Sequence, residues 1–271
     1  MIVLKKGLQF IYFLYFALLF ATLIIISFPF TFIALLLPKK LCDMVMFRMM
    51  QGGSRLLFLM SGIIPKNIHR KHIDFSKSYI IIPSHKSYIE AASIYTSIPT
   101  LFKTLGKKEI ERTPIYGLIF KTVCITVDRS SLSARALSFR KMKQELEQGL
   151  SITIFPEGTF DDTPHSRLLP FQDGCFTLAI MQQTDLLPIL FLDSTNRMHP
   201  SKITQMTPGL NRSVFLPAIS VLDLQKKDLP ALKTYTQRYM QQCLDFILQH
   251  GPDQVWHFAH QYLQNNAIKN A

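Results

Sequence analysis

The sequence is poor in cysteine, with only four among its 271 residues. These cysteines are scattered, and no two of them approach the Cys-x-x-Cys spacing that zinc sites and redox motifs share. We therefore expect no disulfide framework, no metal site and no bound cofactor, and we expect the thiols to be reduced and buried. The cysteines are Cys42, Cys124, Cys175 and Cys243.

Acidic residues are also scarce. There are 18 Asp and Glu residues against 30 Lys and Arg residues, which gives a net charge of +12. Such a chain favours anionic partners, of which nucleic acid and anionic lipid are the obvious candidates. The basic residues are dispersed and no known nucleic-acid motif is visible, so we expect anionic membrane lipids as partners and no nucleic acid.

The N-terminal segment lacks charge altogether from Leu8 to Leu37, between Lys5-Lys6 and Lys39-Lys40. As one helix this run of about 30 residues would span about 45 Å, more than the roughly 30 Å hydrocarbon core of a bilayer. The segment is either one tilted spanning helix or two shorter helices, broken near Pro29, that re-enter the membrane. A cleaved signal peptide is disfavoured, because the run is too long and no small-residue cleavage site follows it.

A Met-rich helix is expected from Leu41 to Ser61, packed beneath the apolar segment. Arg48 and Arg55 favour a cytoplasmic location for the C-terminal side of the apolar segment. We therefore predict an N-terminal membrane anchor with an amphipathic helix over residues 1–61. The catalytic part, residues 62–271, would then face the cytoplasm from a cytoplasmic or inner membrane.

Beyond residue 61, short apolar runs alternate with helical patterns. Such alternation predicts an α/β fold with a mixed, largely parallel sheet flanked by helices. The tail has apolar residues at helical spacing from Pro230 to Gln249, followed by a second helix with Trp256. The predicted strands are Ser78 to Ile82, Val123 to Val127, Ser151 to Phe155 and Leu186 to Leu192, and the predicted helices are Ser87 to Ser97, Ser133 to Gln148 and Asp173 to Gln183.

The first chemical motif follows the first predicted strand, where His85 and Glu90 stand five residues apart. Ligand sites in such sheets lie at the carboxyl ends of strands. Ser87 and Glu90 have the form of a capping box, with Ser87 as the N-cap. A hydrogen bond from His85 to Glu90 would fix the imidazole tautomer and leave the other nitrogen as a general base. Alternatively, Glu90 only caps its helix and His85 is an ordinary turn residue.

Two further motifs follow other predicted strands. Pro156-Glu157-Gly158-Thr159 forms a turn in which proline ends the strand and glycine exposes backbone N–H groups, which suits an anionic or hydroxylated ligand. Arg129 follows Val127-Asp128 and is suited to binding a phosphate with two hydrogen bonds. Lys107 lies in the segment between His85 and Arg129.

The order and spacing of these blocks resemble the glycerolipid acyltransferase family, whose best-known members acylate lysophosphatidic acid. His85 to Glu90 is similar to the first family motif, Gly106 to Arg129 to the second and Phe155 to Thr159 to the third. Leu186 to Ile189 resembles the fourth, an apolar motif with proline. The resemblance covers residues 75–195, and the four blocks in order are far more specific than any one of them.

This resemblance implies acyl transfer from acyl-CoA or acyl-carrier protein to the hydroxyl of a lysophospholipid or related lipid alcohol, without an acyl-enzyme. By the same resemblance, His85 deprotonates the acceptor and Glu90 holds His85. The head group of the acceptor would contact Lys107, Arg129 and the turn formed by Pro156, Glu157, Gly158 and Thr159. The acyl chain would pass Leu187, Pro188 and Ile189 and the apolar face of the anchor.

The sequence departs from the family at two positions. Glu90 replaces the usual aspartate, and Phe160 stands where an arginine usually follows the third motif. A phosphate-bearing acceptor is therefore less firmly implied than acyl transfer itself. Two other classes stay open: a lipid or thioester hydrolase, and a non-catalytic lipid- or carrier-binding protein. A serine hydrolase is disfavoured because no Gly-x-Ser-x-Gly elbow is present.

Overall fold

A computed structural model of the chain describes residues 2–128, 131–160, 167–266 and 268. The chain divides into two compact units, each made of three segments. Unit one comprises Met1–Pro65, Ser87–Met142 and Asp193–Asn211, and unit two comprises Lys66–Lys86, Lys143–Leu192 and Arg212–Ala271.

The described strands form a mixed, mostly parallel seven-stranded sheet with the order β1-β7-β6-β2-β5-β3-β4. The strands are β1 (Ile63–Ile68), β2 (Ile80–Pro83), β3 (Phe102–Lys107), β4 (Cys124–Val127), β5 (Ser151–Thr153), β6 (Leu186–Phe191) and β7 (Gly209–Phe215). The α-helices are α1 (Ile2–Leu35), α2 (Lys39–Met60), α3 (Glu90–Ser97), α4 (Tyr116–Val123), α5 (Leu132–Glu147), α6 (Gly174–Gln182), α7 (Ser194–Arg197), α8 (Leu229–His250) and α9 (Val255–Asn265). Short 3₁₀ helices are η1 (Arg70–His72), η2 (Lys108–Arg112) and η3 (Lys226–Asp228).

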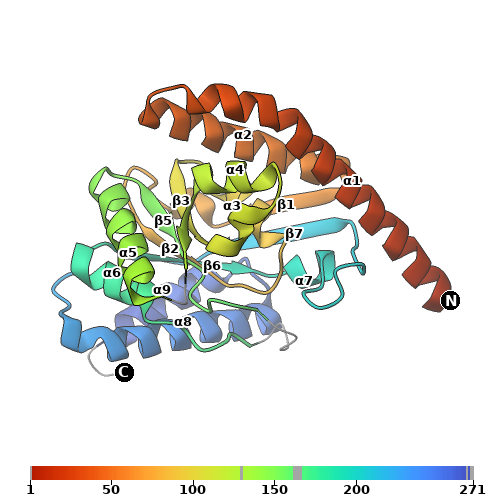
Figure 1. Cartoon of the computed structure of the whole chain (residues 1–271). Helices are drawn as coiled ribbons and strands as arrows, with labels where there is room; N and C mark the ends of the chain where they lie inside the picture. The colour runs from red at the N-terminus through yellow and green to blue at the C-terminus, as the bar shows by residue number, and fades with distance from the viewer. Residues whose placement is uncertain (1, 129–130, 161–166, 267, 269–271) are drawn as a thin grey trace. The chain divides into compact units, whose positions relative to one another are not determined.

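In unit one, α1 and α2 form a helical hairpin in which they lie side by side (Figure 1). The α1 helix continues through Pro29, so the alternative with a break at this proline is wrong. The Tyr12 hydroxyl donates a hydrogen bond to the Ser61 carbonyl, and the Tyr15 hydroxyl donates one to Met60, which fastens the start of α1 to the end of α2. Among the described residues, α1 alone is long and apolar enough to cross a membrane by length and composition.

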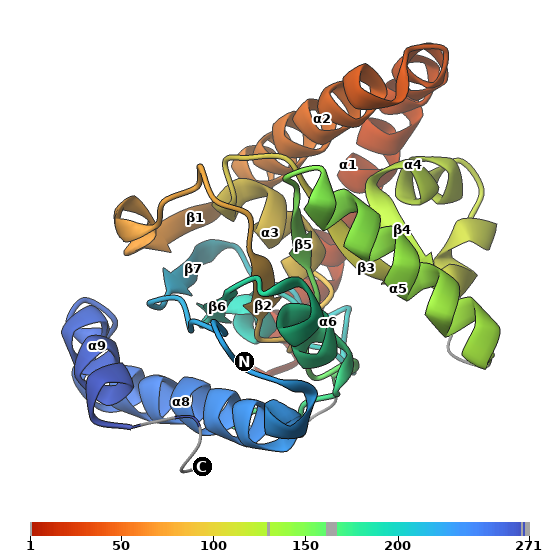
Figure 2. The same ribbon diagram turned by 90° about the vertical axis from the view of Figure 1, so that its left-hand side faces the viewer.

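In unit two, β2 is the buried central strand. It pairs in parallel with β5 and with β6, and β6 pairs antiparallel with β7. Every residue of β2 and β6 is buried, which explains why both strands are continuous apolar runs. The α8 helix contacts α6 and β6, and α9 folds back against one end of α8 (Figure 2).

The four predicted strands are confirmed as β2, β4, β5 and β6, and the predicted internal helices as α3, α5 and α6. The tail is also confirmed, with α8 followed by α9, and α2 is the predicted helix beneath the anchor. The capping box is wrong. The α3 helix begins at Glu90 with Ile89 as its N-cap, so Ser87 lies two residues before the cap. The Ser87 hydroxyl donates to the Met198 carbonyl at 2.6 Å and accepts from the Ile89 amide at 3.4 Å.

Candidate active site

The segment after β2 is held by hydrogen bonds to β6. The Ser84 amide donates to the Ile189 carbonyl, and the Ser84 hydroxyl accepts from the Phe191 amide, both at 2.9 Å. These bonds extend the β2–β6 pairing by one residue and bring the chain to His85 at the carboxyl end of a central parallel strand. Because ligands bind at such strand ends, the placement supports His85 as a site residue.

The Glu157 carboxylate is bonded to the main chain of His85. Its Oε1 accepts a hydrogen bond from the His85 amide and its Oε2 accepts one from the Leu169 amide, both at 2.7 Å. The ammonium of Lys86 lies 3.5 Å from Oε2. Glu157 is 2% exposed and Lys86 is 4% exposed, so the pair is buried. Charged acceptors of this kind form short, strong hydrogen bonds.

Two aromatic rings flank the imidazole of His85, which is half-buried. The ring of Phe155 lies 4.1 Å from it between centroids, and the ring of Phe160 meets it edge to face at 4.5 Å. Both distances are at or below the usual range for aromatic pairs, and such contacts restrict how the ring can turn. The residue that departs from the family at position 160 therefore contacts the proposed base directly.

The turn after β5 is tight, as its glycine predicts, and the exposure of its backbone N–H groups to a ligand stays a prediction. Gly158 has a φ of +69°, which a residue with a side chain adopts only at a cost, and its amide donates to the Phe155 carbonyl at 3.1 Å. The Pro156 carbonyl accepts a hydrogen bond from the Gln172 amide at 2.8 Å. Thr159 is exposed, so its hydroxyl is accessible to a ligand.

Glu90 is the first residue of α3 and is 0% exposed. It belongs to unit one, whereas His85 belongs to unit two, so the hydrogen bond between them stays a prediction. Burial of a carboxylate is costly unless it is paired and hydrogen-bonded, and a helix N-terminus also favours a negative charge.

Lys107 ends β3 in unit one, with its side chain 60% exposed and 3.8 Å from Glu109. Lys108 lies 3.6 Å from Asp128, the last described residue before Arg129. Arg129 itself lies outside the described residues, so its phosphate contact stays a prediction. The exposed lysines show that a positive charge at the end of β3 is available to an anionic ligand.

Leu187, Pro188 and Ile189 are buried in the middle of β6. Their β2 partners are Ile81, Ile82 and Pro83, and this pairing accounts for their burial without any ligand. Their contact with an acyl chain stays a prediction.

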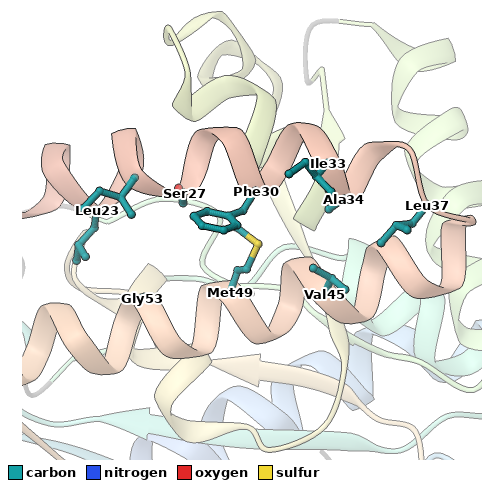
Figure 3. A pocket seen from close by; sticks show the side chains of 10 residues that line it. Leu23, Ser27, Phe30, Ile33, Ala34, Leu37, Val45, Met49 and Gly53 are labelled. Carbon is teal, nitrogen blue, oxygen red and sulfur yellow. The ribbon is translucent and has the colours of Figure 1, made fainter.

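An apolar groove of about 390 Å³ runs between α1 and α2 in unit one. Figure 3 shows Leu23 and Phe30 of α1, and Leu37 of the turn that follows it, pointing towards α2, where Val45 and Met49 face them. This volume is in the range of small-ligand sites. The groove extends the apolar character of α1 onto the neighbouring helix.

The thiols are unsuited to form a covalent intermediate. Burial is the largest cause that raises the pKa of Cys124 and of Cys175, each to about 12. Burial also raises the pKa of Cys42 and Cys243. Because the thiolate is the nucleophile, thiols that stay protonated at neutral pH are inert.

Sequence reasoning missed three participants in this arrangement, which are Ser84, Lys86 and Leu169. Each acts through a main-chain bond or a buried ion pair to a residue distant in sequence. The residues around Ser84 and Lys86 do not indicate that these side chains bind partners distant in sequence. A main-chain amide is present in nearly every residue, so the sequence does not indicate that the Leu169 amide is a donor.

With this geometry in view, residues 64–192 match the family model described as Acyltransferase. This segment, 129 of the 271 residues, is similar to the acyltransferase family. The family segment begins in β1 and ends just after β6, so it contains His85, Glu90 and the turn after β5.

Relatives of the acyltransferase segment are distant. The chain is 28% identical over 151 residues to an uncharacterized acyltransferase of Schizosaccharomyces pombe, which covers 55% of this chain and 52% of that one. It is 26% identical over 164 residues to the 1-acyl-sn-glycerol-3-phosphate acyltransferase alpha of Mus musculus, with coverages of 59% and 56%. The matches thus span little more than half the length of these curated relatives.

The fold matches a solved acyltransferase over nearly the whole chain. The crystal structure of the 1-acyl-sn-glycerophosphate (LPA) acyltransferase PlsC from Thermotoga maritima superposes with a TM-score of 0.70 at 17% identity, covering 91% of this chain and 98% of that chain. The predicted α/β architecture is therefore confirmed.

Proposed function

We propose that this chain transfers a fatty acyl group from an acyl thioester to the hydroxyl of a lysophospholipid or a related lipid alcohol. The observation that carries the proposal is His85, which stands at the carboxyl end of β2 with its amide bonded to Glu157 of the turn after β5. This geometry lies within an acyltransferase-family segment. The donor is acyl-CoA or acyl-carrier protein.

The proposed reaction is a direct transfer. His85 removes the proton of the acceptor hydroxyl as its oxygen attacks the thioester carbonyl carbon. The tetrahedral intermediate collapses, the carbon–sulfur bond breaks, and the sulfur leaves as a thiol with the proton from His85. The products are an ester and a free thiol, so the residues are unchanged after each turnover.

Other residues take supporting roles in this proposal. Glu90 accepts a hydrogen bond from His85 and fixes its tautomer. Lys107 and Arg129 attract an anionic head group, and the Thr159 hydroxyl donates a hydrogen bond to it. The exposure of Lys107 and Thr159 supports these two assignments.

The helical hairpin of α1 and α2 is proposed to attach the chain to a membrane with the catalytic part on the cytoplasmic side. The apolar α1 helix and the groove beside it support contact with lipid acyl chains. Such an attachment would deliver lipid acceptors without their passage through water, which suits substrates that reside in a bilayer. Anionic membrane lipids are the expected surface partners, given the net charge of +12.

The test is thiol release from acyl-CoA, and in parallel from acyl-carrier protein, by detergent-purified protein with and without lysophosphatidic acid. Wild-type release should require the acceptor. His85→Ala should lower it by about 10²–10⁴-fold, the usual contribution of a general base. His250→Ala is the matched control, because this exposed histidine ends α8 and should leave turnover unchanged.

Acceptor-independent release that vanishes in His85→Ala would instead identify a thioesterase. Equal turnover in wild type and His85→Ala would remove His85 as the base. Absence of release with both donors, and with a panel of lysophospholipid acceptors, would favour a lipid- or carrier-binding protein over the proposed enzyme.

A further inference from the structure

Glu157 and Lys86 form a buried ion pair in unit two that the proposed reaction does not consume. Their side chains are 0% and 6% exposed, and the ammonium lies 3.5 Å from Oε2 of the carboxylate. Removing two charges from water costs several kcal/mol each, which only good pairing and additional hydrogen bonds can offset. An arrangement this costly indicates a specific task at this position.

Main-chain hydrogen bonds offset part of the cost of burying the Glu157 carboxylate. Oε1 accepts from the His85 amide and Oε2 accepts from the Leu169 amide, each at 2.7 Å. Glu157 therefore connects the segment after β2 to the turn after β5 and to the loop before α6. With no exposed side-chain surface, its carboxylate is closed to a lipid head group.

We propose that Glu157 is a positioning residue that holds the main chain of His85, with Lys86 as its counter-charge, and that it makes no contact with the acceptor. This inference rests on the proposed function of His85 as a base. It replaces the direct acceptor contact that family resemblance implies for Glu157.

Two of the partners of Glu157, His85 and Lys86, are adjacent in sequence. One carboxylate oxygen takes the amide of residue 85 and the other faces the ammonium of residue 86, so consecutive residues are tied to one turn. The segment from Ser84 to Ser87 has no regular secondary structure of its own. A shift of about 1 Å in a reacting group can cost about 10²-fold in rate, so this tie has kinetic consequences.

The first variant is Glu157→Gln. Glutamine keeps one acceptor oxygen but turns an NH₂ group towards a backbone donor, and it removes the carboxylate charge that faces the Lys86 ammonium. We expect kcat to fall by about 10- to 100-fold with the acceptor KM within about twofold of wild type, as expected when a group is misplaced and not unbound. A raised acceptor KM with unchanged kcat would overturn the proposal.

The second set of variants changes Lys86. Lys86→Met should lower both kcat and the melting temperature, because the buried Glu157 carboxylate then loses the ammonium that lies 3.5 Å from it. Lys86→Arg should recover part of kcat, and the double variant Lys86→Met with Glu157→Gln should be more stable than Lys86→Met alone. Additive losses in melting temperature would show that the two residues are not coupled.

A matched control is the ion pair of Asp173 and Lys233, which is in the same unit but is 61% and 33% exposed. Asp173→Asn and Lys233→Met should change neither kcat nor the melting temperature measurably, since exposed pairs contribute little. If these controls lose as much kcat as the buried pair, general charge removal and not positioning would explain the result.

A third experiment uses NMR and does not depend on enzymatic activity. In protein labelled with [¹⁵N]histidine, only eight histidine amides give signals, and the His85 signal is the one lost in His85→Ala. The Glu157→Gln change should shift this amide proton upfield, because a bond to a carboxylate becomes weaker or is lost. An unmoved signal would overturn the contact, whereas a wild-type protein without turnover but with the shift would count against the proposed function alone.

Discussion

Two charged clusters at the carboxyl ends of parallel strands differ sharply in burial. After β2, Lys86 and Glu157 pair at 3.5 Å with side chains 6% and 0% exposed. At the end of β3, Lys107 and Glu109 pair at 3.8 Å with side chains 60% and 59% exposed. Both pairs join a lysine and a glutamate near the ends of strands, and they differ in burial.

This difference separates two tasks that charge performs at a strand end. An exposed pair contributes about 0–1 kcal/mol, so its partners exchange readily for an anionic ligand. A buried pair that loses one member costs about 3–5 kcal/mol, so it keeps its geometry. The cluster after β2 is therefore suited to holding the main chain, and the lysines at the end of β3 are suited to attracting a substrate.

The same contrast occurs within β3 itself, which allows a direct test. Lys103, near the start of the strand, lies 2.7 Å from Asp43 of α2 and donates to the Thr122 carbonyl at 2.9 Å, with both charged side chains under 10% exposed. Lys103→Met should lower the free energy of unfolding by about 3–5 kcal/mol, because Asp43 loses its buried partner and, among the described residues, keeps the exposed Lys39. Denaturant titration with α-helical circular dichroism as the signal measures this.

The control for Lys103 is Lys143→Met, which removes an exposed partner of Glu147 in α5. It should change the free energy of unfolding by less than about 1 kcal/mol. A loss below about 1 kcal/mol in Lys103→Met as well would break the distinction between buried and exposed pairs in this molecule.

The opposite end of β3 should respond in binding and not in stability. Lys107→Ala should raise the KM for lysophosphatidic acid by about tenfold, equivalent to about 1.4 kcal/mol, while the free energy of unfolding changes by less than about 1 kcal/mol. The reason is that an exposed ammonium loses a charge-assisted contact with the ligand but no structural partner. The KM is measured with varied acceptor at saturating donor.

The effect of Lys107 on the acceptor KM should depend on ionic strength. Raising the ionic strength should increase the wild-type acceptor KM and reduce the difference between wild type and Lys107→Ala, because exposed charges are screened. Lys143→Ala, with a similarly exposed lysine, is the control and should match wild type. An unchanged KM in Lys107→Ala at low salt would remove Lys107 from the acceptor site.

Sequence predicted β2, β5 and β6, which are buried throughout, and the apolar strand β4, but it missed the strands that carry more polar residues. β2 and β6 are continuous apolar runs, and their identity as strands followed from that alone. β1, β3 and β7 were missed, since each carries polar or charged residues such as Lys103 and Asn211 whose partners lie in other elements. Short-range patterns do not encode those partners.

The site shows the same limit. His85 and the turn after β5 were found because each motif is contiguous. The bond between the His85 amide and Glu157 joins residues 72 positions apart and depends on β2 and β5 being neighbours. Alternation of strands and helices does not assign strand order, so the sequence could not predict this bond. The contact of Glu157 with the acceptor was predicted from the family resemblance. Phe160 was read as a missing arginine, whereas its ring contacts His85.

Between the buried and the exposed ion pairs lies a third kind of group, a half-buried side chain that titrates near neutral pH, and His69 is such a group. Its Nε2 lies 3.0 Å from the Pro252 carbonyl and donates to it, and its ring lies 5.6 Å from that of Trp256. Burial is the largest cause that lowers the pKa of His69 below 6.5, opposed by this hydrogen bond and by Asp253, while His72 and Lys71 lower it further.

The sign of the resulting pH dependence follows from proton binding. Between the lowered pKa of folded His69 and its ordinary value of 6.5, the unfolded chain binds more protons, so the free energy of unfolding falls as the pH drops below 6.5. Denaturant unfolding followed by fluorescence of Trp256, the only tryptophan, should show this loss. His69→Gln retains a donor for Pro252 without the titration and should flatten the dependence. A slope that is the same in wild type and His69→Gln would assign it to other groups and leave the contact between His69 and Pro252 without a role in pH-dependent stability.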